Sequence, residues 1–137
     1  MIYSMYDTAI GQFLFTINNI DDTIPENSIA GAFNDQDHYV DLATKTVVEK
    51  PTQPTTNHYW DWITKSWLLD NQQATASARQ QRNSLLSTVD RVNPVWYSTL
   101  TADQQQELQQ YRTQLLNVPE QSGFPTTIDW PTKPSWL

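Results

Sequence analysis

Residues 38–48 read HYVDLATKTVV and residues 58–68 read HYWDWITKSWL, so one pattern occurs twice, twenty residues apart. In each copy an aspartate, Asp41 or Asp61, precedes three residues, a lysine and a β-branched or aromatic run. An Asp carboxylate can accept backbone N–H groups at the start of a turn, and loops of about three to five residues join hairpin strands. The pattern predicts two similar β-hairpins. Because the lysine stands where Gly or Asn is usual, the turn type stays open.

The remainder of the first 70 residues also favours β structure. Residues 12–17 hold a short apolar run that follows a glycine, and residues 28–33 hold another that follows a Pro-Glu-Asn break. The Pro- and Thr-rich residues 51–56 predict a stiff, extended connector between the hairpins. We therefore expect residues 1–70 to form a small β-rich domain with antiparallel strands.

Two histidines, His38 and His58, hold equivalent positions in the repeat, and an aspartate follows each of them three residues later. A zinc site needs three or four converging ligands and a supporting shell of hydrogen bonds. A shared place at the start of a strand explains the matching histidines more simply. We expect neither a metal site nor a cofactor.

The sequence changes character at Asp70. Residues 72–91 are rich in Ala, Gln, Arg and Leu, and Asp70 or Asn71 can cap this helix. Residues 101–104 read TADQ, a capping box that begins a second helix. We expect residues 71–117 to form an antiparallel helical hairpin. The apolar stripes are narrow, so the β domain, a second copy or a partner must cover them.

Residues 118–137 show no periodicity, and prolines interrupt them repeatedly. They favour an extended tail, because prolines lower the entropy that such a tail loses when a partner captures it. For residues 118–131 the sequence is equally compatible with a tail packed over its own helical hairpin. The fold class is thus α+β: a small antiparallel β unit with two hairpins, a helical hairpin, and an extended Pro/Trp tail.

Aromatic residues are unusually frequent, with six Trp and six Tyr in 137 residues. Tyr and Trp are enriched at protein interfaces because they bury much area while losing few torsions. They can also compensate for a small core, and the sequence leaves both interpretations open. If they serve an interface, the candidate partner-binding residues are Tyr59, Trp60, Trp62, Trp67, Tyr111, Trp130 and Trp136.

Composition and motifs argue against several functions. The net charge is −7 with only 8 Lys and Arg, so nucleic acid and anionic membranes are unlikely partners. The chain has no Cys, which excludes disulfides and a thiol nucleophile, and it has no P-loop, nucleophile elbow or His-Glu-x-x-His motif. The adjacent acids Asp21 and Asp22 lie in a polar stretch where carboxylates are normally solvated. We expect a protein that is not an enzyme and works inside the cell.

Four motifs in a fixed order carry a resemblance to a known family. They are RQQRNSLLSTVD at residues 79–90, YRTQL at 111–115, VPEQSGFP at 118–125 and IDWPTKP at 128–134. Each motif is weak by itself, whereas the ordered combination is specific. From about residue 78 to residue 134 the chain resembles the phage tail assembly chaperone family.

The resemblance implies a bacteriophage tail fibre assembly chaperone. Such a protein would bind the fibre subunits, assist their folding and trimerisation in the host cytoplasm, and either leave or remain on the virion tail fibre. The alternative is a structural or receptor-binding component of the virion tail, because Trp and Tyr rings also stack on carbohydrate.

Overall fold

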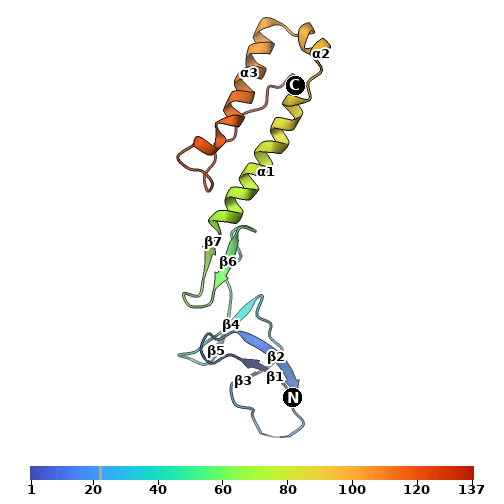
Figure 1. Ribbon diagram of the computed structural model, residues 1–137. Helices are drawn as coiled ribbons and strands as arrows, with labels where there is room; N and C mark the ends of the chain where they lie inside the picture. Colours follow the sequence, from blue (N-terminus) through green and yellow to red (C-terminus); the bar gives the residue numbers. More distant parts are fainter. Residues whose placement is uncertain (22) are drawn as a thin grey trace. The chain divides into compact units, whose positions relative to one another are not determined.

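The computed structural model describes residues 1–21 and 23–137 (Figure 1). Asp22 lies outside the described residues, so the adjacent-acid pair is not visible as a pair. The chain divides into two compact units, Met1–Leu68 and Leu69–Leu137. The first holds β-strands and the second holds helices, which confirms the α+β class. The helices and the C-terminal segment, expected as separate parts, lie in one compact unit.

The first unit begins with an antiparallel sheet of β1 (Ile2–Tyr6), β2 (Phe13–Asn18) and β3 (Ser28–Ala30). In the described residues its strand order is β2-β1-β3, so β1 is central. The expected strands at residues 12–17 and 28–33 are present, the second shortened, whereas β1 was not anticipated. Its Ser4 is fully buried, and the Ser4 hydroxyl donates to the Gly31 carbonyl and accepts the Phe33 N–H, both at 2.8 Å.

The repeat forms the two predicted hairpins. The first pairs β4 (His38–Asp41) with β5 (Thr46–Glu49), and the second pairs β6 (His58–Asp61) with β7 (Ser66–Leu69). β4 and β5 are antiparallel in a register that places Asp41 opposite Thr46. Each loop therefore has four residues, within the expected range.

The aspartate and the lysine that the two copies of the repeat share both lie in the turns. In the first, Asp41 Oδ1 accepts the N–H groups of Ala43 and Thr44, at 2.9 and 3.4 Å, and the Asp41 carbonyl accepts the Lys45 N–H at 2.7 Å. Lys45 has φ 57°, and the equivalent Lys65 has φ 52°. Both lysines adopt the left-handed conformation that usually favours Gly or Asn. The question that the sequence left open is thus answered: the lysine itself takes the left-handed position of each turn.

The same turn also connects β1 to β2. Asp7 Oδ1 accepts the N–H groups of Ala9 and Ile10, at 2.7 and 3.1 Å, and the Asp7 carbonyl accepts the Gly11 N–H at 2.8 Å. Gly11 has φ 70° and corresponds to the left-handed lysines. The Gly11 carbonyl accepts the Val40 N–H at 2.9 Å, so this turn is bonded to the β4–β5 hairpin. The pattern of the repeat therefore extends to the N-terminal sheet.

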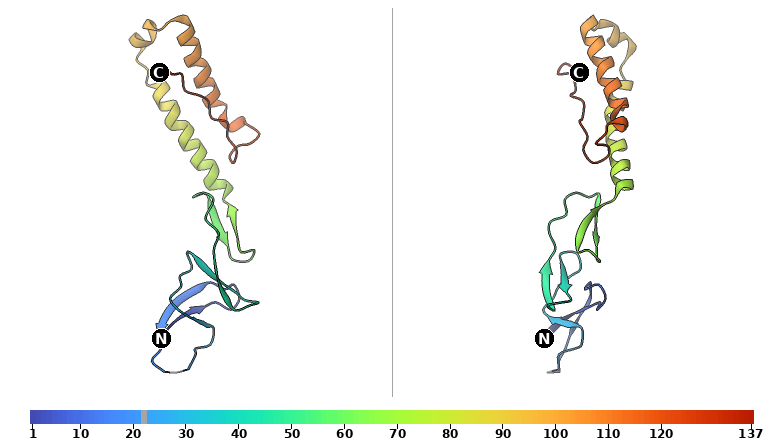
Figure 2. Two further views of the ribbon diagram at one scale, coloured as in Figure 1. Left: turned by 180° about the vertical axis from the view of Figure 1, so that it is seen from behind. Right: turned by 90° about the vertical axis from the view of Figure 1, so that its left-hand side faces the viewer.

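The second unit contains α1 (Asn71–Asp90), α2 (Pro94–Thr99), α3 (Ala102–Leu116) and the 3₁₀ turn η1 (Val118–Glu120). The helices α1 and α3 run side by side in opposite directions, as predicted (Figures 1 and 2). Asp70 caps α1 through the Gln73 N–H, and the capping box of Thr101 and Gln104 begins α3. The expected link between the helices contains a short helix, α2, which Asn93 caps.

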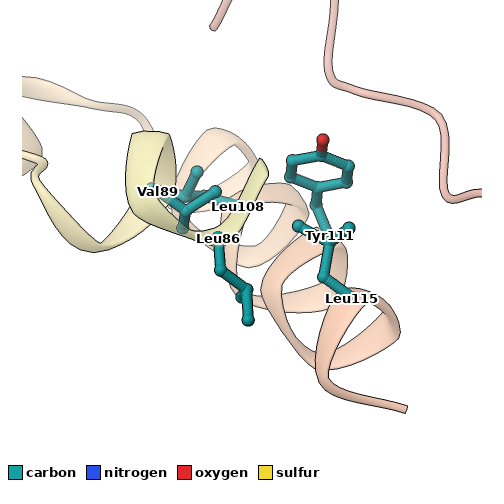
Figure 3. Packing of buried hydrophobic residues seen from close by; sticks show 5 residues of the cluster. All are labelled: Leu86, Val89, Leu108, Tyr111 and Leu115. Carbon is teal, nitrogen blue, oxygen red and sulfur yellow. The ribbon is translucent and has the colours of Figure 1, made fainter. Parts of the chain in front are cut away.

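The core of this unit lies between α1 and α3 (Figure 3). It consists of Leu86, Val89, Leu108, Tyr111 and Leu115. The C-terminal segment returns along the helical hairpin (Figure 2), and its last residues, Trp136 and Leu137, pack against the core. The narrow helical stripes therefore gain cover from the end of the tail, beyond the residues for which the sequence suggested such packing.

Candidate partner-binding surfaces

Trp60 is the centre of an aromatic cluster in the first unit. Its ring centroid lies 5.3 Å from that of Trp67 and 6.2 Å from that of Trp62, both edge-to-face. The Tyr39 ring, from the other hairpin, lies 5.6 Å away. Edge-to-face contacts at these distances are favourable for aromatic rings. The repeat thus brings together three of the predicted partner-binding residues, and they also hold the two hairpins against each other.

Two lysines occupy faces of these rings. Lys50 Nζ lies 4.2 Å from the Trp62 centroid and 4.9 Å from the Trp60 centroid, and it donates to the Asp35 carbonyl. Lys65 Nζ lies 5.4 Å from the Trp62 centroid and donates to the Trp62 carbonyl at 2.6 Å. Partial burial lowers the pKa of both ammonium groups, and nearby aspartates oppose that shift. The indole faces are therefore engaged by cations of the same unit.

Tyr59 differs from its neighbours in the cluster. Trp60, Trp62 and Trp67 are half-buried, whereas Tyr59 is 52% exposed. The Trp67 indole N–H donates to the Pro51 carbonyl at 2.7 Å and so is also satisfied within the unit. Of these predicted contact residues, Tyr59 has the most ring surface free for another molecule.

A polar pocket of about 530 Å³ lies beside Trp67. Its walls carry the Asp37 and Glu49 carboxylates, the Gln36 and Gln53 amides and the Trp67 ring. Planar polar groups around an aromatic ring can bind hydroxyl-rich ligands, because amides and carboxylates hydrogen-bond to hydroxyls while the ring packs on C–H groups.

The aromatic residues predicted for the second unit take different places. Tyr111 is 3% exposed and belongs to the core, so in this structure its ring has little surface open to another molecule. Trp136 is half-buried, donates to Glu107 Oε2 at 2.5 Å and lies 6.4 Å from the Trp96 ring. Trp130 is half-buried and lines a pocket of about 440 Å³. Trp130 is thus the predicted residue of this unit with an open pocket beside it.

An apolar pocket of about 330 Å³ lies where α1, α2 and α3 meet, and sequence reasoning did not anticipate it. Its lining is mainly apolar, and the ion pair of Arg112 Nε with Asp90 Oδ1, 2.7 Å long, belongs to its wall. Both charged side chains are about half exposed. The pocket is lined by Val89, Asp90, Val92, Pro94, Tyr97, Leu108, Gln109 and Arg112.

Residues 75–135 match the family model described as phage tail assembly chaperone protein. In this segment the chain is similar to that family. It includes most of α1, all of α2 and α3, and the returning C-terminal segment, so the apolar pocket and Trp130 both lie within the chaperone-family segment. No curated protein and no solved structure matches the chain. The family match supports a role in phage tail assembly.

Outside the segment that matches the family model, several apolar side chains in and next to the N-terminal sheet are exposed. Leu14 is 55% exposed, Phe15 59% and Ile20 94%, and Met1 and Ile2 are also exposed. Sequence reasoning did not single out these residues as a surface. An indirect signal was present, because residues 12–17 are uncharged and their apolar run Phe13–Phe15 lacks the alternation of a strand with one solvated face.

The repeat histidines take unlike environments. His58 Nδ1 lies 2.8 Å from the Thr55 hydroxyl, and the His38 ring packs edge-on against Phe33 at 5.5 Å. Within residues 1–21 and 23–137, no group of three His, Cys, Asp or Glu side chains is placed to hold a metal ion. In the same residues no helix is both long and apolar enough to cross a bilayer.

Proposed function

We propose that this chain is a bacteriophage tail fibre assembly chaperone that binds fibre subunits and assists their folding and trimerisation. The observation that carries the proposal is the match of residues 75–135 to the tail assembly chaperone family. The proposed place of action is the host cytoplasm during assembly, and the chaperone either leaves the finished fibre or stays on it.

The proposed mechanism is transient burial. Fibre subunits expose apolar surface and unpaired strand edges before the chains associate, and such surfaces aggregate. A protein that covers these surfaces keeps the fibre subunit soluble until other fibre subunits replace the chaperone. Release needs no nucleotide, because the larger buried surface of the fibre trimer supplies the driving force.

The apolar pocket of the helical unit is the proposed contact within the family segment. An apolar fibre side chain placed beside Val92 and Tyr97 would lose its exposure to water, at about 25 cal/mol for each Å² buried. The adjacent Asp90–Arg112 pair can hydrogen-bond to the backbone of the bound segment. Tyr59 and Trp130 are the proposed aromatic contacts, because each retains accessible ring surface or an open pocket.

Co-expression tests the proposal directly. The fibre gene of the same phage is expressed alone, with this chain, and with a Val92→Arg variant whose side chain fills the mouth of the pocket. A Gln81→Arg variant, which adds the same charge at an exposed position of α1 away from the pockets described above, is the matched control. We expect soluble trimeric fibre with the wild-type chain and with the control only. Equal yields in every arm would refute the chaperone role.

The polar pocket beside Trp67 favours a second candidate function, a receptor-binding component of the virion tail. Its carboxylates, amides and indole are suited to a saccharide. Trp60 and Trp62, the rings that sequence reasoning favoured for stacking, have faces covered by Lys50. Two results would support this candidate. The isolated protein would bind a glycan, and this binding would be lost in Trp67→Ala and kept in Trp62→Phe. Purified virions would contain this protein in amounts comparable to those of the fibre protein.

A further inference from the structure

We infer that the free edge of β2 is a docking edge on which an extended apolar segment of the tail protein adds as a further β-strand. This inference rests on the proposed function, since it names the surface through which the chaperone would hold an unassembled subunit. The edge lies in the N-terminal sheet, outside the segment that matches the chaperone family.

The hydrogen-bond pattern shows which backbone groups of β2 face outward. Met1 and Asn19 exchange hydrogen bonds in both directions, 2.7 and 2.9 Å long. In an antiparallel pair the bonded residues alternate with residues whose N–H and C=O point away from the partner. In the register of β1 and β2, Ile17 and Phe15 are therefore the next bonded residues. Thr16 and Asn18 direct their backbone groups away from β1, toward the edge at which β2 pairs with no further strand among the described residues.

The side chains of this edge are also unprotected. β2 reads FLFTIN, with no charged residue and no proline, although natural edge strands usually carry Lys, Pro or strong twist to prevent pairing. Leu14 and Phe15 are more than half exposed. The register shift at Met5/Tyr6 places an irregularity near Leu14, and the regular edge runs from Phe15 to Asn18. An exposed, uncharged edge of this kind is suited to strand addition.

The size and chemistry of the edge indicate an extended segment as its occupant. Outward groups of Thr16 and Asn18 offer about four hydrogen bonds, which only another backbone in extended conformation can match in spacing. A strand of this length covers far less than the roughly 1,200 Å² that a stable interface between folded proteins buries. The edge by itself therefore suits a segment that is held briefly, as a chaperone requires, better than a lasting dimer.

A Thr16→Pro variant tests the inference on the full chain. Proline removes the outward N–H and adds a ring at the edge, and edge strands accept proline where the N–H faces solvent. Thr16→Val keeps the N–H and the branched shape and is the matched control. We expect Thr16→Pro to bind the co-expressed fibre subunit at least about tenfold more weakly than Thr16→Val. Equal affinities of two folded variants would overturn the inference.

Amide hydrogen exchange on the unaltered chain gives a second, independent test. On adding the fibre subunit, the Thr16 and Asn18 amides should become protected, while amides already bonded to β1 change little. Unchanged exchange at both residues in the complex would overturn the inference, even if Thr16→Pro fails to fold. Protection in the isolated chain that grows with its concentration would assign the edge to a second copy and also overturn it. If Thr16→Pro still yields trimeric fibre, the result supports the chaperone role and refutes the docking edge.

Discussion

Replacing Gly11 by Ala should weaken the N-terminal unit strongly, and the turns offer a control at an equivalent position. Gly11 has φ 70°, and a Cβ atom at this residue would lie 2.2 Å from the Val40 carbonyl oxygen. The left-handed conformation costs a non-glycine residue about 1–2 kcal/mol. Relief of the close contact must separate Gly11 from Val40, which breaks their 2.9 Å hydrogen bond at a cost of about 1 kcal/mol.

The expected total loss for Gly11→Ala is about 3 kcal/mol, a large part of the roughly 5–15 kcal/mol that stabilises a typical domain. Lys45→Ala is the control, because Lys45 already has φ 57° and the substitution adds no left-handed strain. It removes an exposed side chain whose ammonium group lies 5.8 Å from the Tyr6 ring centroid, a contact worth about 0.5 kcal/mol.

Amide hydrogen exchange measures this difference residue by residue, which separates the two units of the chain. Amides of β1, β2 and β4 should exchange much faster in Gly11→Ala than in Lys45→Ala, and those of α1 should be unchanged. If the two variants agree within about 0.5 kcal/mol at the Val40 amide, the left-handed turn and its contact with β4 do not stabilise the unit as argued.

Other substitutions probe the turns and the helical unit. Asp41→Ala should destabilise its hairpin by about 1 kcal/mol in thermal unfolding, because two turn N–H groups lose their acceptor. Hydrogen bonds from Thr64 hold the pKa of the Asp61 carboxyl below its usual value. The ionised carboxylate should therefore stabilise its hairpin fully above the ordinary pKa, and this stabilisation should disappear as pH falls through the lowered pKa. Hydrogen exchange of the β6 and β7 amides, measured against pH, checks this. In urea titrations Tyr111→Ala should cost about 3 kcal/mol, because it opens a cavity in the core, and Arg112→Ala less than about 1 kcal/mol, because its ion pair is half exposed.

The elements that could be predicted from the sequence are those that depend on contacts between residues close together in the chain. The aspartates of the repeat, the N-cap at Asp70 and the capping box at Thr101 each use a side chain to bond nearby backbone, so the pattern is visible within a few residues. The turn at Asp7 escaped detection for two reasons. Glycine replaces the lysine at Gly11, and the distance to the next copy is not twenty residues.

Elements that depend on distant partners could not be predicted. The central strand β1 contains Ser4, a buried polar residue whose hydroxyl is bonded to Gly31 and Phe33, so the usual apolar alternation is interrupted. The contacts of the lysines with the indole rings could not be predicted for the same reason. Lys50 lies ten residues or more from both rings it covers, and only the folded hairpins bring them together.

The aromatic excess of this chain therefore has a structural explanation that differs from simple surface stickiness. A two-stranded hairpin has no core, and flat rings that meet edge-to-face and carry lysine on their faces can hold two hairpins together. Aliphatic side chains cannot be satisfied in this way, because they bind only through burial. The exposed Leu14 and Ile20 are consequently better candidates for contact with a partner than the half-buried Trp60. A search for the proposed fibre-binding surface should start at the N-terminal sheet and the pocket of the helical unit.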